Sequence, residues 1–209
     1  MPVTHTILQK FIVLEGLDGS GTSTQMELLA ARLAREGRPH WLTCEPTDGP
    51  IGRLIRDILR REVNALPRTI AMLFAADRNE HVGAPLIGIA ARAARGELVV
   101  CDRYLFSSLA YQSIECGFDF VRDLNLGFPL PECMIFLDTP VRVCQERVSR
   151  RSLPELFDGH EYQTRVREAY LRAIEVFRGM GMRIETLDGD RPAELIEREI
   201  WEIIAGFRK

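Results

Sequence analysis

The chain contains almost no lysine. Of its 27 basic residues only Lys10 and Lys209 are lysines, and all the others are arginines. Arginine is preferred where phosphate is held by planar, bidentate contacts, although a biased genome composition produces the same usage. The formal net charge of −3 is small and negative, so the overall charge gives no reason to expect a nucleic-acid or anionic-membrane partner.

Three further absences narrow the class of protein. No apolar run approaches the roughly 20 residues that cross a bilayer, which argues against a membrane-spanning helix. Residues 1–10 lack the apolar core of a signal peptide, so we expect a cytoplasmic protein. None of the five cysteines forms a C-x-x-C pair, which favours buried, reduced thiols over a zinc site or a disulfide framework. The length predicts one domain over residues 1–209.

One stretch of the sequence organises the rest. Residues 11–25 are FIVLEGLDGSGTSTQ, and the four apolar residues at their start predict a strand buried on both faces. Gly16, Gly19 and Gly21 then allow a tight loop whose backbone N–H groups can face an anion. Helical spacing begins at Thr22, so the loop ends at a helix N-terminus, where phosphate is favoured.

The glycine spacing matches the nucleoside-triphosphate loop G-x-x-x-x-G-K-[ST]. Ser23 stands where the motif places a Mg²⁺ ligand, but the lysine position is occupied by Thr22. An ordinary glycine-rich turn is the alternative. A dinucleotide-binding G-x-G-x-x-G pattern fits less well, because it needs a third glycine where Thr24 stands. Phosphate binding is the favoured interpretation.

Strands and helices alternate along the chain, which predicts an α/β fold with a parallel sheet covered on both faces. After the first strand, further strands are expected at 40–44, 98–101, 133–137 and 183–187. The expected helices are 22–36, 51–61, 67–95 with a break near 83–85, 105–116, 141–147, 160–180 and 192–207. Polar clusters follow the strands at Glu45, Asp102, Asp138 and Asp188. Ligands bind at the carboxyl ends of such strands, so this edge is the expected site.

Two pairs of residues can carry chemistry, and each has an ordinary structural explanation. Phe74 and Arg78 are four apart on a helix, so a ring and a guanidinium can hold a planar base. The alternative is a core phenylalanine beside a solvated arginine. Asp102 and Arg103 directly follow a strand, where they can bind Mg²⁺ and phosphate. The alternative is a helix-capping aspartate with a surface arginine.

A cluster of arginines precedes a basic loop at about 148–160. Arg147, Arg150 and Arg151 share one helical face if the helix continues. Arginines entering such a loop can close over a transferring phosphate as a lid, whereas the alternative is a solvated charged face.

Taken together, these motifs resemble the thymidylate kinase family, within the P-loop nucleoside-monophosphate kinases, over almost the whole chain. The resemblance rests on the stretch at 11–25, LFAADRNEH, VVCDRY with Ser107-Ser108 and Tyr111-Gln112, Leu137-Asp138, Arg165-Val166-Arg167 with Tyr170, and LDGD at 187–190. It implies a three-layer α/β/α P-loop kinase fold with a five-stranded sheet. It also implies transfer of the ATP γ-phosphoryl group to dTMP with Mg²⁺, giving dTDP and ADP for dTTP synthesis, commonly by a homodimer.

The resemblance also assigns residues. It places ATP on Gly16, Gly19, Ser20, Gly21, Thr22, Ser23, Thr24, Arg147 and Asp190, and Mg²⁺ on Ser23 and Asp102. It places dTMP on Asp18, Glu45, Phe74, Arg78, Arg103, Ser108, Tyr111 and Gln112. The implied catalytic residues are Asp18, Arg103, Arg150 and Arg151. Phe74 is expected to stack on thymine and Arg78 to bond its edge. The Glu45-Pro46 peptide is a candidate for the cis form.

Thr22 departs from the family, which usually has lysine at this position. Lys10 is expected at the opposite end of the sheet, so it cannot supply the missing charge. Our hypothesis is that Arg151 or Arg150 of the lid supplies it, because phosphoryl transfer depends on cations around the developing charge. Two alternatives stay open, namely a kinase for another nucleotide and a nucleotide-binding protein with weakened catalysis.

Overall fold

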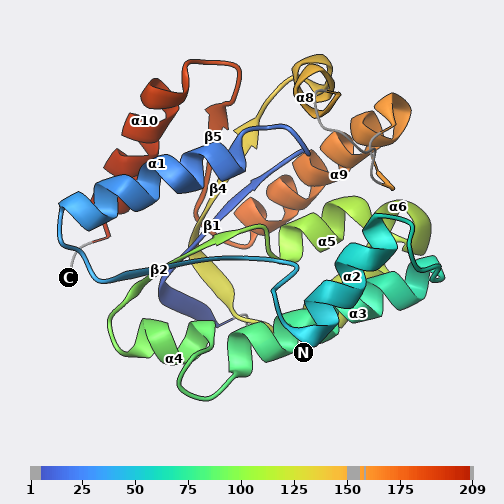
Figure 1. Cartoon of the computed structure of the whole chain (residues 1–209), viewed down its shortest axis with the longest axis horizontal. Helices are drawn as coiled ribbons and strands as arrows, with labels where there is room; N and C mark the ends of the chain where they lie inside the picture. Colours follow the sequence, from blue (N-terminus) through green and yellow to red (C-terminus); the bar gives the residue numbers. More distant parts are fainter. Residues whose placement is uncertain (1–5, 150–155, 158, 208–209) are drawn as a thin grey trace.

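The computed structural model describes residues 6–149, 156–157 and 159–207. These residues contain a five-stranded, all-parallel sheet in the order β2-β3-β1-β4-β5, with helices on both faces (Figure 1). The strands are β1 (Ile7–Gly16), β2 (His40–Cys44), β3 (Leu98–Asp102), β4 (Leu130–Asp138) and β5 (Ile184–Asp188). The predicted α/β class and parallel five-stranded sheet are confirmed.

The helices largely follow the predicted ranges. They are α1 (Thr22–Arg35), α2 (Pro50–Leu59), α3 (Pro67–Gly83), α4 (Ile89–Ala94), α5 (Leu105–Tyr111), α6 (Ser113–Cys116), α7 (Phe118–Asn125), α8 (Val141–Val148), α9 (His160–Gly179) and α10 (Ala193–Ala205). The expected break near 83–85 separates α3 from α4. Helix α7 was not predicted, and β4 begins three residues before its predicted start because Leu130 already pairs with Ile7.

The central strand β1 packs against both helical layers. Phe11 and Val13 belong to a core cluster with residues of α5 and α9, whereas Ile12 and Leu14 belong to a second cluster with α1 and α10. Figure 1 shows α1 and α10 on one side of the sheet and α3, α4, α5 and α9 on the other. All four β1 side chains are fully buried, as the continuous apolar run predicts.

The carboxyl ends of the strands meet at one edge. Cys44 of β2 and Leu14 of β1 are both in register with Asp102 of β3. The opposite edge contains Lys10, whose Nζ donates to the carbonyl of Gly96, two residues before β3, at 3.3 Å. This geometry confirms that the polar strand ends converge and that Lys10 lies at the far end of the sheet.

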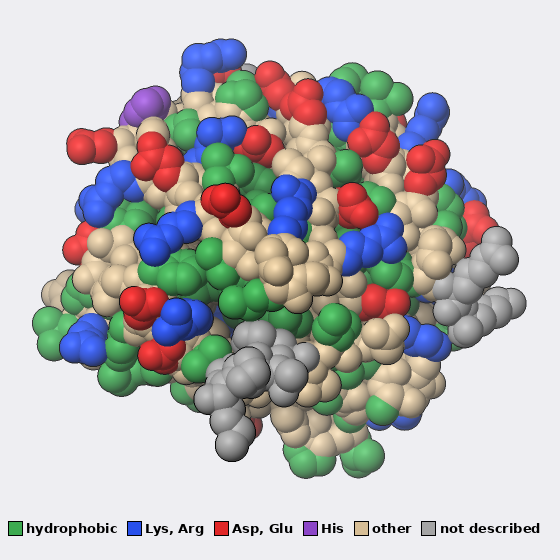
Figure 2. Space-filling view, turned by 180° about the vertical axis from the view of Figure 1, so that it is seen from behind, with side chains coloured by type: hydrophobic (Ala, Val, Ile, Leu, Met, Phe, Trp, Pro, Cys, Tyr) green, Lys and Arg blue, Asp and Glu red, His purple; other side chains and the backbone are tan. Residues whose placement is uncertain are grey.

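The expectation of buried thiols is met by three of the five cysteines, and Cys116 is only partly buried. Basic and acidic side chains intermingle on the face shown in Figure 2. No helix within the described ranges is long and apolar enough to cross a membrane. All five cysteines are free, and Cys101, Cys133 and Cys144 are buried. Cys44 is exposed, contrary to the expectation of a buried thiol, because it ends the edge strand β2 beside a cavity.

Candidate active site

The loop between β1 and α1 is shaped by its glycines. Gly19 and Gly21 have φ angles of 85° and 106°, in the left-handed region that favours glycine. A Cβ atom on Gly19 would lie 2.4 Å from the carbonyl oxygen of Cys144 in α8, and one on Gly16 would lie 2.3 Å from Ser20 Oγ. The tight loop at the N-terminus of α1 is therefore confirmed, and it packs directly against α8.

Arg103 lies against this loop. Its Nη2 donates to Asp18 Oδ1 at 2.7 Å and its Nη1 to the carbonyl of Gly16 at 3.0 Å. Arg103 has a φ of 70°, which is unusual for a residue with a side chain. Burial lowers the pKa of its guanidinium, but neighbouring acidic groups, led by Tyr111 and Asp18, raise it overall, so the group is a permanent cation. Tyr111 donates its hydroxyl to Asp18 Oδ2 at 3.0 Å, and burial raises the pKa of this phenol.

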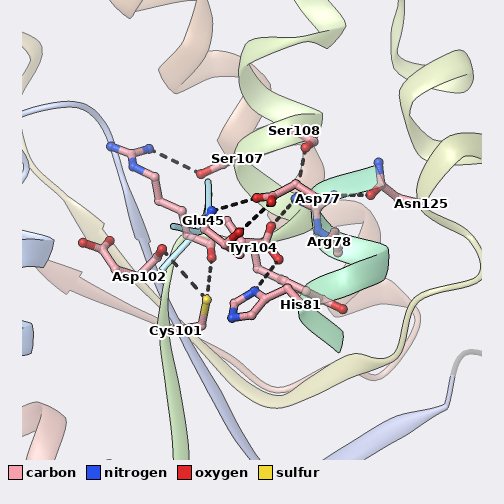
Figure 3. Close-up of polar contacts among 12 residues, drawn as sticks. Glu45, Asp77, Arg78, His81, Cys101, Asp102, Tyr104, Ser107, Ser108 and Asn125 are labelled. Atoms are coloured by element: carbon pink, nitrogen blue, oxygen red, sulfur yellow. Dashed lines mark hydrogen bonds and ion pairs between the residues drawn. The ribbon is translucent and has the colours of Figure 1, made fainter. Parts of the chain in front are cut away.

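Arg78 is buried, which excludes the interpretation of a solvated arginine. Only 1% of the residue is exposed, and its Nη2 donates to Glu45 Oε2 at 2.6 Å and to Ser108 Oγ at 3.2 Å. Its Nη1 bonds Asn125 of α7. Glu45 also contacts His81 Nδ1 at 3.1 Å, so the carboxylate lies between the two side chains of α3 (Figure 3). The Glu45-Pro46 peptide is cis.

Two buried polar atoms near this cluster have no hydrogen-bond partner among the described residues. They are Nε of Arg78, which is a donor, and Oε1 of Gln112, which is an acceptor. Both residues line the same cavity. Buried polar atoms are rarely left unsatisfied, so one free donor and one free acceptor are available to a ligand in this cavity.

The cavity has a volume of about 620 Å³ and joins the glycine loop to helices α2, α3 and α5. The predicted site residues that line it are Asp18, Gly19, Gly21, Thr22, Ser23, Thr24, Glu45, Phe74, Arg78, Asp102, Arg103, Tyr111, Gln112 and Arg147. Three further predicted residues do not line the cavity but bond arginines that do. Gly16 bonds Arg103, Ser20 bonds Arg147, and Ser108 bonds Arg78. Arg150 and Arg151 lie outside the described residues.

Arg147 connects the loop to the chain after β5. Its Nη1 donates to the carbonyls of Gly19 at 3.2 Å and Ser20 at 3.1 Å, and weakly to Gly189 at 3.4 Å. Asp190, the next residue, is exposed, and its N–H donates to Asp188 Oδ1 at 3.0 Å. Arg147 therefore links the glycine loop to Gly189, the residue before Asp190.

The oxygen atoms of Ser23 and Asp102 suit a magnesium ion. Ser23 Oγ donates to Asp102 Oδ2 at 3.3 Å, while the other carboxylate oxygen is buried without a partner in the described part of the chain. Asp102 does not cap α5, whose N-cap is Tyr104 with no side-chain cap. No group of three His, Cys, Asp or Glu side chains in the described ranges could hold a metal alone. Mg²⁺ ordinarily uses one or two carboxylates and completes its shell with phosphates and water, so Ser23 and Asp102 could hold it beside a bound phosphate.

Several residues of the site were missed from the sequence. Arg56, Leu59, Arg60, Cys44 and Phe157 also line the cavity. Arg56 of α2 and Arg60, the C-cap residue of that helix, are four apart, a spacing that the apolar stripe on the same helix obscured. Phe157 packs its ring 5.7 Å from that of Tyr111, and no periodicity in its loop could have indicated this contact.

Comparisons with known proteins agree with this geometry. A family model described as thymidylate kinase matches residues 14–200. A putative thymidylate kinase of Treponema pallidum is 39% identical over 97% of this chain and 98% of its own. One from Aeropyrum pernix is 37% identical over 93% and 91% of the two chains. A probable thymidylate kinase of Thermococcus gammatolerans is 40% identical over 94% and 99%. Coverage of this extent, together with the loop and the cavity, means that the chain belongs to the thymidylate kinase family.

Proposed function

We propose that the protein transfers the γ-phosphoryl group of ATP to dTMP, giving dTDP and ADP. The observation that carries this proposal is the position of Arg103. Its guanidinium is hydrogen-bonded to Gly16 and Asp18 of the glycine loop and lines the cavity that contains Phe74 and Arg78. A cation between a phosphate loop and an acceptor pocket can stabilise the charge that develops during phosphoryl transfer. The names of the relatives support the same reaction.

The unpaired atoms of the cavity support thymine as the base. Thymine presents a carbonyl acceptor beside an N–H donor, which complements Nε of Arg78 and Oε1 of Gln112. We assign stacking on the base to Phe74, which is half-buried and lines the cavity. Tyr111 packs beside the sugar position, where a ribose 2′-hydroxyl would have to fit, and Ser108 and Glu45 hold Arg78 in place.

The glycine loop from Gly16 to Thr24 is the proposed ATP phosphate site, with Arg147 and Asp190 toward the adenine side. Ser23 and Asp102 are the proposed holders of Mg²⁺. When bound, this ion supplies positive charge next to the phosphates. The backbone N–H groups at the start of α1 bind and orient the anion, which is the usual role of such a helix N-terminus.

We propose that Arg151 or Arg150 supplies the charge of the lysine that is absent at position 22. A double Arg150→Ala, Arg151→Ala variant is expected to lose turnover by about 10³-fold or more while dTMP binding survives. A single-turnover assay measures the rate of phosphoryl transfer, and calorimetry measures the affinity for dTMP. Near-normal turnover would refute this assignment and would indicate that Arg103 and Arg147 supply the positive charge.

A coupled ADP-release assay with dTMP, dUMP, dCMP and AMP tests the function. Activity restricted to dTMP is the expected result. Activity with another nucleotide would identify a kinase of different specificity, and nucleotide binding without ADP release would identify a protein that has lost catalysis. The second outcome is disfavoured because the acceptor cavity retains Phe74, Arg78, Asp102 and Arg103.

We further propose a homodimer that works in the cytoplasm. The exposed apolar side chains of Leu66 and Met72, at α3, are 74% and 50% exposed and support a partner for this helix. Free cysteines are in keeping with a reducing compartment. Light scattering should give about twice the mass of one chain, and a monomer at micromolar concentration would contradict the dimer.

A further inference from the structure

Glu15, the residue before the glycine loop, is a fully buried carboxylate. Its Oε1 accepts the backbone N–H groups of Tyr104 at 2.8 Å and Ser107 at 3.2 Å. Its Oε2 accepts the hydroxyl groups of Ser107 at 2.7 Å and Tyr170 at 2.9 Å. Burying a carboxylate costs free energy, even with four hydrogen bonds, so its presence here calls for a reason other than stability.

Two of the four groups bonded to Glu15, the hydroxyls of Ser107 and Tyr170, also contact Arg103. Nη1 of Arg103 donates to Ser107 Oγ at 3.3 Å and to Tyr170 OH at 3.4 Å. Tyr104 directly follows Arg103, so the bond from its N–H to Glu15 fixes the peptide that joins them. Arg103 is held in the left-handed region at φ 70°, where a residue with a side chain stays only if its surroundings impose that conformation. Glu15 therefore acts on Arg103 through both backbone and side chain.

We propose that Glu15 is a positioning residue for phosphoryl transfer, which holds the guanidinium of Arg103 against the glycine loop without touching either substrate. Glu15 is not among the described residues that line the cavity. The proposal rests on the proposed function, because it assumes that Arg103 acts on the phosphates. Burial raises the pKa of the Glu15 carboxyl to about 7, although the Ser107 hydrogen bond and the Arg103 charge lower it. The carboxylate is thus retained at a cost to the fold.

The test uses the full chain and the isosteric variant Glu15→Gln. The amide oxygen can still accept the two backbone N–H groups, but the amide nitrogen cannot accept from the hydroxyls of Ser107 and Tyr170. We expect kcat with dTMP and ATP to fall about tenfold to hundredfold, as for a small misplacement of a reacting group. Both KM values should change far less. The melting temperature should stay constant or rise, because a buried ionisable group is removed.

A second variant and a matched control keep the test decisive. The double Ser107→Ala, Tyr170→Phe variant removes both hydroxyls that join Glu15 to Arg103 and should lower kcat by a similar factor. Adding Glu15→Gln to it should then have little further effect, since residues in one network are not additive. Glu197→Gln removes a carboxylate partnered by Arg32 on the other face of the sheet and should leave kcat unchanged.

Two results would overturn the proposal. One is a Glu15→Gln enzyme with kcat within about twofold of the parent, and the other is a fall in kcat that only follows a loss of folded protein. If Glu15→Gln fails to fold, the double hydroxyl variant decides, and native kcat there overturns the role of Glu15. Failure of the parent chain to phosphorylate dTMP would instead refute the proposed function, so the two failures are distinct.

Discussion

The two helical layers contain the same kind of ion pair in very different surroundings. Arg32 of α1 bonds Glu197 of α10 at 2.9 Å, with 24% and 13% of the two side chains exposed. Arg78 of α3 bonds Glu45 at 2.6 Å, with 1% and 2% exposed. The first pair lies at the edge of an aliphatic interface, whereas the second is almost fully buried in the wall of the cavity. A pair that water can still reach costs little to form, but a sealed pair must be fully compensated.

The rest of each layer follows the same division. The buried residues that α1 and α10 contribute to their core cluster are aliphatic, among them Leu29, Leu33, Ile196 and Ile200. On the other face, the polar side chains of Asp77, His81 and Asn125 are buried, and the core cluster there includes several aromatic rings. The α1/α10 layer therefore packs mainly aliphatic side chains on the sheet, whereas the other layer combines a large apolar core with buried charges, which cost stability. Substitutions in each layer test this difference.

Arg103→Ala should have the largest effect on the reaction. Loss of a cation at transferring phosphates typically costs about 10³ to 10⁵ in rate, so we expect kcat to fall by at least about 10³-fold. Steady-state kinetics with dTMP and ATP measures this change. Arg32→Ala in the other layer is the matched control and should leave kcat unaltered. A loss below about tenfold for Arg103→Ala would contradict its bridging role.

Glu45→Gln should have the largest effect on stability. It leaves the guanidinium of Arg78 buried without its countercharge, which typically costs about 3–5 kcal/mol of unfolding free energy. The misplaced Arg78 should also raise KM for dTMP more than KM for ATP. Urea denaturation and steady-state kinetics measure the two effects. A loss under about 1 kcal/mol would mean that water reaches this pair and that the two layers do not differ as described.

Ile200→Ala in α10 should separate stability from activity. Ile200 is fully buried against the sheet, and truncating such a side chain costs about 2–5 kcal/mol through lost burial and the cavity that remains. We expect kcat to be unchanged at temperatures where the variant is folded. A lower kcat in fully folded protein would show that the α1/α10 layer also positions the site.

Glu15 should give the pH dependence of stability a definite sign. Its folded pKa of about 7 lies above the ordinary value of 4.5, so the fold favours the protonated form. The contribution of Glu15 to the free energy of unfolding is therefore most favourable below pH 4.5 and is lost as the pH rises through 7. The difference in unfolding free energy between the parent and Glu15→Gln should therefore fall by about 2–3 kcal/mol between pH 4.5 and pH 7.5. A difference that is independent of pH would contradict this shift.

The loop and the sheet could be predicted from the sequence because their signals are local. The spacing of Gly19 and Gly21 predicts the loop, and the apolar run from Phe11 to Leu14 predicts a strand covered on both faces. Asp102 could be placed at the edge of the sheet because it ends an apolar run. Each of these inferences needs only a few consecutive residues and the rule that parallel strands share one carboxyl edge.

The acceptor pocket could be predicted only in part, because its contacts join distant segments. Arg78 looked solvated by spacing alone, and its burial depends on Asn125, 47 residues away on a helix that was not predicted. The hydrogen-bond network of Glu15 could not be predicted, since a single acidic residue in a buried strand says nothing about its partners. Tyr170, 155 residues from Glu15, completes that network, and only folding brings the two together.

Glu197→Gln is the smallest expected change and the sharpest test of the comparison. It removes the countercharge of Arg32, as Glu45→Gln removes that of Arg78, with the same change of side chain. Because water reaches both side chains and Arg32 also lies over the ring of Trp201 at 4.4 Å, we expect a loss of no more than about 1 kcal/mol. Urea denaturation at low and high salt measures it. A loss as large as that of Glu45→Gln would show that burial does not decide the value of these pairs, and the division between the layers would then need another cause.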